Sequence, residues 1–146
     1  MCGKLVVSLA LLAAFTVCTF GFELTEEGKK HLQECQGKHS ISPDEVVAAV
    51  KDKKLPESEN GKCFMECVME KFGVLNDGKF DPEKAKSIAS GKIGNKPELL
   101  EKVNTVIDKC NAEVSNPGKC EYGVGLAKCA MKYAKEMNIS EIPIGN

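Results

Sequence analysis

Cysteine is the residue type in this chain whose spacing could support chemistry. Cys63 and Cys67 stand four apart in the segment KCFMECVMEKFGVLNDGKFDPEKA, residues 62–85. Two thiols at this spacing on a helix could bind a metal, form a redox pair or belong to two different disulfides, and the polar turn that follows could bind calcium. Each of these sites needs further residues, so the rest of the chain decides between them.

The metal and redox alternatives lack their partners. A zinc site needs a second pair of ligands at matching spacing, whereas His31 and His39 lie in a different segment from Cys63 and Cys67. A thioredoxin-type pair has two residues between its cysteines and a βαβ setting, and the sequence has neither. We therefore predict no metal, no cofactor and no redox centre.

The polar turn does not have the ligands of a calcium loop. If Gly78 were the sixth residue of such a loop, carboxylates would be required at its first, third and twelfth positions. Those positions hold Gly73, Leu75 and Lys84. The Asn-Asp-Gly sequence is instead typical of a tight turn, which we expect to join two helices.

The first residues have the features of a secretory signal peptide. Lys4 precedes an unbroken apolar run, LVVSLALLAAFTV, and Thr19 and Gly21 are small residues before a cleavage point. We predict a signal peptide over residues 1–21 and a secreted, extracellular domain over residues 22–146, with a signal anchor as the alternative. No later apolar run approaches membrane length.

Six cysteines remain after the signal peptide, and an even number in a small secreted chain predicts three disulfides. Cys63 and Cys67 share one helix face, so a bond between them would be strained. Cys120 and Cys129 lie on nearly opposite faces of one helix and also need separate partners. Ten of the fifteen possible pairings remain. The helix that carries Cys63 and Cys67 is thus predicted to be bonded to two different neighbours.

The elements that position these cysteines are predicted to be helices. Sustained strand-like alternation is absent, and apolar residues recur at three- and four-residue spacing. Ser42-Pro43-Asp44-Glu45 is a capping box, and Pro117-Gly118 separates the last two helices. We predict one all-α, six-helix, disulfide-linked domain with helices over residues 25–38, 46–51, 61–72, 82–88, 97–110 and 120–137.

The charge of the chain argues against a nucleic-acid partner. The predicted mature chain has 19 Lys and 21 acidic residues, a net charge near −2, and contains no Arg. Arginine supplies the planar fork that binds phosphates and guanine edges. Lysine and glutamate are interspersed, as on ordinary solvated helix faces.

The cysteine spacing Cys35-x27-Cys63-x3-Cys67-x42-Cys110-x9-Cys120-x8-Cys129 resembles the six-cysteine signature of insect odorant-binding proteins of the pheromone-binding and general odorant-binding type. The resemblance runs from the first helix to the tail. It implies three disulfides: Cys35–Cys67, Cys63–Cys120 and Cys110–Cys129.

The resemblance also implies a fold and a function. The fold is six helices around an apolar cavity. The function is that of a secreted, non-enzymatic carrier, a monomer or weak homodimer, which takes small hydrophobic, semi-volatile ligands such as odorants or pheromones to a membrane odorant receptor. Met65, Met69 and Phe72 form a helical stripe suited to such a cavity, although a plain core would explain it equally. Tyr122 and Tyr133 are candidate polar contacts. The full set of predicted ligand contacts is Met65, Met69, Phe72, Ile88, Val103, Val106, Ile107, Tyr122, Leu126, Tyr133 and Ile142.

The tail, residues 138–146, carries three isoleucines that would be costly to leave together in water. We predict that it forms a short lid over the cavity, with a disordered end as the alternative. The tail also contains a glycosylation sequon, Asn138-Ile139-Ser140. Some relatives release ligand at low pH through histidines, but both histidines of this chain lie near the first helix, which argues against that mechanism.

Two other classes of function fit the chain less well. A secreted lipase would need a nucleophile motif, and neither Gly-x-Ser-x-Gly nor His-Glu-x-x-His occurs. A secreted helical interaction module of a venom, immune or hormone-like type would bind through an exposed apolar groove instead of an enclosed cavity. We keep this module as the alternative to the carrier.

Overall fold

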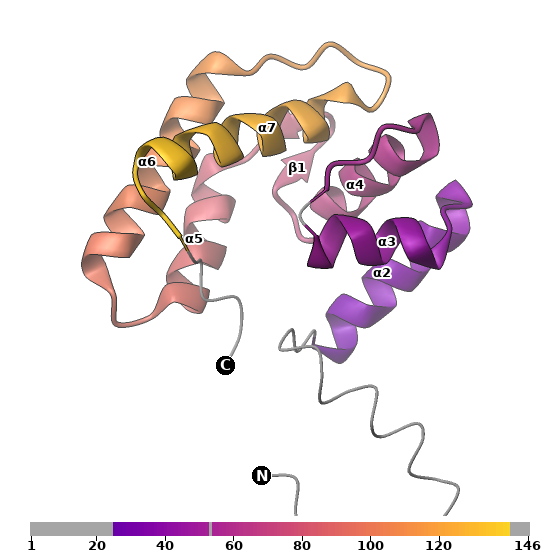
Figure 1. The fold of residues 1–146 in the computed structure, drawn as a ribbon, viewed down its shortest axis with the longest axis horizontal. Helices are drawn as coiled ribbons and strands as arrows, with labels where there is room; N and C mark the ends of the chain where they lie inside the picture. The colour runs from indigo at the N-terminus through magenta and orange to yellow at the C-terminus, as the bar shows by residue number, and fades with distance from the viewer. Residues whose placement is uncertain (1–24, 53, 141–146) are drawn as a thin grey trace, which may run out of the picture.

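A computed structural model describes residues 25–52 and 54–140 of the chain. The described residues form six helices and one two-stranded hairpin (Figure 1). The helices are α2 (Glu26–His39), α3 (Pro43–Lys51), α4 (Glu59–Lys71), α5 (Pro82–Ile93), α6 (Pro97–Glu113) and α7 (Glu121–Glu136), and the strands are β1 (Leu75–Asn76) and β2 (Lys79–Phe80). None of these helices is both long and apolar enough to cross a membrane. The predicted all-α architecture is confirmed.

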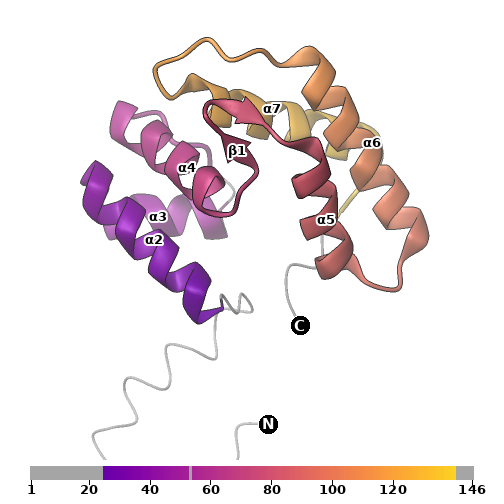
Figure 2. The ribbon, with the colours of Figure 1, turned by 180° about the vertical axis from the view of Figure 1, so that it is seen from behind.

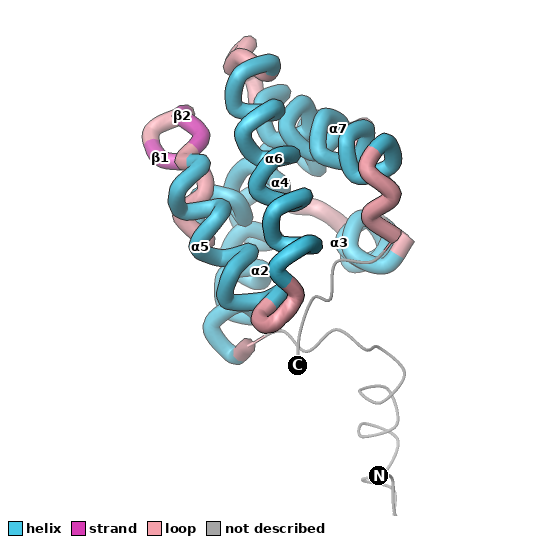
Figure 3. Tube along the Cα trace, turned by 90° about the vertical axis from the view of Figure 1, so that its left-hand side faces the viewer, coloured by secondary structure: helices cyan, strands magenta, loops and turns pink. Residues whose placement is uncertain are grey.

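The helices form two groups joined by α7. Figures 1 and 2 show α2, α3 and α4 together on one side, α5 and α6 on the other, and α7 crossing from α6 to α4. The hairpin is the chain connection between the two groups. Seen from the side in Figure 3, it lies at one edge of the molecule, with α3 at the opposite edge.

Capping side chains set most of the helix starts. The backbone N–H of Glu45 donates to Ser42 Oγ and the Ser42 N–H donates to the Glu45 carboxylate, so the predicted capping box is present. Helix α4 starts two residues earlier than predicted because Ser58 Oγ accepts from the Gly61 N–H at 3.0 Å.

Helix α5 continues five residues beyond its predicted end at Ile88. Gly91 costs the helix up to about 1 kcal/mol relative to alanine, but it does not break the helix. Ile93, at the last position, is buried, and α5 packs along α6. The helix stops at Gly94, whose φ of +60° suits glycine.

The hairpin contradicts the prediction that the chain forms no strands. Leu75 pairs with Phe80 across a turn in which Asp77 and Gly78 both have positive φ, as a type I′ turn requires. Asn116, from the loop before α7, donates its side-chain amide to the Gly78 carbonyl at 2.7 Å. The hairpin is therefore attached at its tip to the α6–α7 loop.

Two clusters of buried apolar residues make up the core. One lies mainly between the hairpin, α6 and α7, and it includes Leu75, Val106 and Leu126. The other lies between α2, α4 and the segment before α3, and its buried members are Cys35, Ile41, Phe64 and Cys67. Helix α4 contributes to both clusters.

Three disulfides connect the helices: Cys35–Cys67, Cys63–Cys120 and Cys110–Cys129. These are the pairs that the family resemblance implied. The first joins α2 to α4, the second joins α4 to the start of α7, and the third joins α6 to α7. Helix α4 is thus bonded to two different neighbours, as the helix geometry of Cys63 and Cys67 required.

Replacing Gly123 by alanine is expected to lower the free energy of unfolding by about 1–3 kcal/mol, the usual cost of overpacking. A Cβ there would lie 2.9 Å from Glu66 Cγ and 3.3 Å from Met69 Sδ, where α7 meets α4. The matched control is Gly91→Ala on α5, because a Cβ at Gly91 meets nothing within 4 Å. The control should stabilise the helix by up to about 1 kcal/mol. Urea unfolding of both variants measures the contrast, and equal effects would contradict this packing.

Candidate functional site

An apolar pocket of about 170 Å³ lies among α4, α6, α7 and the hairpin. It is open to solvent on one side, so in the described part of the chain it is a pocket and not an enclosed cavity. Its lining consists of Met69, Val74, Phe80, Val106, Ile107, Cys110, Leu126, Ala127 and Ala130. The pocket offers a ligand dispersion contacts and release from water, without a polar side chain to hydrogen-bond.

Helical spacing explains how α6 and α7 supply most of this lining. On α6, Ile107 follows Val106 by one residue and Cys110 follows it by four. On α7, Ala127 and Ala130 follow Leu126 by the same intervals, so each set lies on one face of its helix. The Cys110–Cys129 disulfide joins the two helices beside the pocket. The small side chains on α7 leave the space that larger residues would fill.

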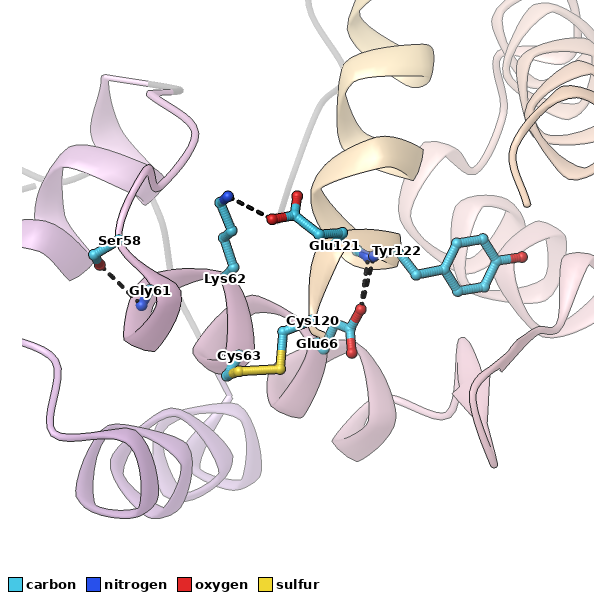
Figure 4. The surroundings of a disulfide bond; sticks show 9 residues. Ser58, Gly61, Lys62, Cys63, Glu66, Cys120, Glu121 and Tyr122 are labelled. Carbon is cyan, nitrogen blue, oxygen red and sulfur yellow. Dashed lines mark hydrogen bonds and ion pairs between the residues drawn. A yellow bond between two sulfur atoms is a disulfide. The ribbon is translucent and has the colours of Figure 1, made fainter. Parts of the chain in front are cut away.

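The start of α7 is attached to α4 by three different interactions, drawn in Figure 4. The Cys63–Cys120 disulfide joins the two helices covalently. Glu66 Oε1 accepts hydrogen bonds from the backbone N–H groups of Tyr122 at 2.9 Å and Gly123 at 3.1 Å. Cys120 gives α7 no side-chain cap, so the carboxylate of α4 satisfies two of the free N–H groups of the first turn.

The third interaction is an ion pair. The Lys62 ammonium lies 2.6 Å from Glu121 Oε1, and the Lys62 side chain is mostly covered. Together these interactions fix the end of α7 that precedes the pocket-lining residues. The pocket wall therefore depends on the contact between α4 and α7.

Four of the predicted ligand contacts meet in the pocket: Met69, Val106, Ile107 and Leu126. They come from three helices, so their convergence is a property of the fold and not of any one segment. Their role in binding stays a prediction.

The other predicted contacts lie elsewhere. Three are buried outside the pocket lining: Val103, Tyr122 and Tyr133. Met65 and Ile88 are partly buried and also lie outside it. Phe72 is 38% exposed, and its ring packs edge-on against His31 of α2. Ile142 lies outside the described residues.

The hydroxyl of Tyr133 is already engaged within the protein. It donates a hydrogen bond to the Glu113 carboxylate, and this bond, together with burial, raises the pKa of Tyr133. The ammonium groups of Lys109 and Lys132 lie 4.5 and 4.6 Å from the ring centre, within the range of a cation–π contact. This tyrosine joins α6 to α7 beside the pocket.

Val74, Phe80 and Ala127 were not among the predicted contacts. The first two flank the Asn-Asp-Gly turn, and apolar residues on both sides of Asp-Gly are a recognised hairpin signal. The turn was predicted to join two helices, so the apolar residues on either side of it were not predicted to line a pocket. Nothing in the sequence distinguishes Ala127 from other helix-surface alanines.

The chain after α7 turns back onto the core. Asn138 has a positive φ and donates its N–H to the Lys135 carbonyl at 3.2 Å, while the Ile139 N–H donates to the Ala134 carbonyl at 2.8 Å. This is the Schellman pattern of helix termination, and Ile139 packs against the hairpin–α6–α7 cluster. Residues 141–146, which hold the rest of the predicted lid, lie outside the described residues.

Titratable and metal-ligating groups are not gathered at the pocket. His31 and His39 both belong to α2, away from its lining. Within residues 25–52 and 54–140, no three His, Cys, Asp or Glu side chains are grouped so as to hold a metal ion.

Comparison with known proteins gives related sequences. A family model described as the PBP/GOBP family matches residues 20–133. General odorant-binding protein 56a of Drosophila melanogaster is 30% identical over 130 residues, which cover 83% of this chain and 87% of that protein. Odorant-binding protein 22 of Aedes aegypti is 24% identical over 131 residues, covering 88% of this chain and 90% of the relative.

Solved structures share the fold. Odorant-binding protein dmelOBP28a from Drosophila melanogaster superposes with a TM-score of 0.65 at 25% identity and covers 77% of this chain and 93% of its own. Fatty acid binding protein OBP56a from the oral disk of the blowfly Phormia regina superposes with a TM-score of 0.61 at 28% identity. The match covers 79% of this chain and 98% of the blowfly chain. The cysteine signature, the disulfide-linked helices and these matches agree, and the chain belongs to the PBP/GOBP family of odorant-binding proteins, which are carriers of hydrophobic ligands and not enzymes.

Proposed function

We propose that this protein is a secreted, non-enzymatic carrier that binds one small hydrophobic molecule in the pocket among α4, α6, α7 and the hairpin. The observation that carries the proposal is the lining itself, in which all nine residues are apolar or disulfide-bonded. Burying apolar ligand surface there is favourable by roughly 25 cal/mol per Å². The ligand would be carried through extracellular fluid to a membrane odorant receptor.

The pocket volume limits the ligand. Its 170 Å³ is close to the roughly 150 Å³ of an apolar cavity that binds benzene, and below the roughly 300–1,000 Å³ typical of sites for drug-sized molecules. One ring or a short aliphatic segment therefore fits. A longer molecule must extend through the open side.

The relatives support the same class of ligand. The blowfly protein is named a fatty acid binding protein, and the others are named odorant-binding proteins. An aliphatic chain, whether from an acid, an alcohol or an ester, suits a lining without hydrogen-bonding side chains.

The proposal is tested by titrating the oxidised protein with the apolar fluorophore N-phenyl-1-naphthylamine and displacing it with straight-chain 1-alkanols of increasing length. Each added methylene should tighten binding about fourfold, since burying one methylene group contributes about 0.8 kcal/mol to the free energy of binding. The gain should level off once the chain exceeds the pocket. Absence of saturable fluorophore binding, or affinity independent of chain length, would overturn the proposal.

A further inference from the structure

A second hollow, of about 410 Å³, lies on another face of α7. It is bounded by the segment between α3 and α4, by the first turn of α4 and by α7. Its lining is Lys54, Leu55, Pro56, Glu57, Lys62, Val124, Lys128 and Met131. We call it the lysine groove. It shares no lining residue with the apolar pocket.

The lysine groove has an apolar base. Val124 is 3% exposed and Met131 is 47% exposed, one near the start of α7 and the other two turns later. Leu55 and Pro56 are partly buried on the other side. A half-exposed methionine beside an aliphatic strip offers an adaptable contact for a flexible chain.

Lysine dominates the charge around the base. Lys62 is neutralised by Glu121. Lys54 and Lys128 are exposed and form no ion pair with any of the described residues, and Glu57 is the one carboxylate in the lining. The groove therefore combines an apolar strip with an excess of positive charge.

We propose that the lysine groove binds a single anionic amphiphile, a molecule with an aliphatic chain and a carboxylate head. The chain lies along Val124, Leu55 and Met131, and the carboxylate accepts charge-assisted hydrogen bonds from Lys54 and Lys128. The volume falls within the range typical of small-molecule sites. This site is separate from the apolar pocket and does not depend on the function proposed above.

Two methionines make the sites distinguishable in one experiment. Met69 lines the apolar pocket and Met131 lines the lysine groove. In protein labelled at the methionine methyl groups, sodium dodecanoate below its micellar concentration should shift the Met131 signal saturably. The neutral analogue 1-dodecanol should shift Met131 at least fivefold less effectively at low salt.

The variant Lys54→Gln/Lys128→Gln should weaken dodecanoate binding at Met131 roughly fivefold, and about 1 M salt should weaken wild-type binding similarly. The control Lys92→Gln/Lys102→Gln removes the same charge from exposed lysines of α5 and α6, outside the groove, and should change binding less than twofold. The proposal fails if Met131 does not shift, if dodecanol matches dodecanoate there, or if the control variant loses as much affinity. Shifts at Met69 report the apolar pocket independently.

Discussion

Replacing Cys63 and Cys120 together by alanine lowers the free energy of unfolding by about 4 kcal/mol. These cysteines are 57 residues apart in sequence, the widest separation of the three disulfides. In the chain-entropy model, a cross-link that closes a loop of this length lowers the entropy of the unfolded chain and so stabilises the native state by about 4 kcal/mol. The same model gives about 3 kcal/mol for the 19-residue separation of Cys110 and Cys129. The bond also joins the two helix groups, so its loss weakens the contact between α4 and α7.

Urea unfolding of the wild type and the double variant measures this effect. Glu66 and its hydrogen bonds to the start of α7 remain in the variant, so the native fold should persist at low denaturant. A loss below about 1 kcal/mol would show that the noncovalent contacts alone fix α7 to α4. That result would contradict a major role for the Cys63–Cys120 disulfide in stability.

Replacing Ala130 by phenylalanine lowers the affinity for apolar ligands at least tenfold. Ala130 is partly buried on α7 and lines the pocket. A phenylalanine ring there occupies space that a ligand needs, and the overpacking itself costs about 1–3 kcal/mol of stability. Fluorophore titration measures the affinity, and urea unfolding reports whether the fold is retained.

The matched control is Ala112→Phe, which adds the same ring at an exposed position of α6. This variant should bind the fluorophore as the wild type does. If Ala130→Phe is folded and binds normally, the pocket is not the ligand site. If both variants lose binding equally, the effect does not come from filling the pocket.

Local patterns were sufficient to predict the framework. Ser42 with Glu45 indicated the start of α3, and helical periodicity indicated α6 with its buried Val103, Val106 and Cys110. The spacing of Cys63 and Cys67 required bonds from α4 to two neighbours. All of these depend on residues close together in sequence, where backbone geometry limits the outcome.

The pocket was predictable only in part, because its lining depends on how the helices approach one another. Periodicity shows that a residue faces inward, as it does for Tyr122 and Val106, but not whether it meets packed atoms or open space. The hairpin wall with Phe80 was missed because its strands are two residues long, too short for an alternation pattern. In the sequence, Glu66 cannot be told from an ordinary helix-surface glutamate. It caps the first turn of α7 only because the fold brings the start of α7 against α4.

The central claim is that an apolar ligand occupies the pocket among α4, α6, α7 and the hairpin. It is tested most directly by titrating methyl-labelled protein with N-phenyl-1-naphthylamine and observing contacts from ligand protons to methyl groups. We predict saturable one-to-one binding with contacts to the methyl groups of Met69, Val106, Ile107 and Leu126, and none to Met65. Saturable binding with contacts only outside this set, or no saturable binding, would contradict the claim.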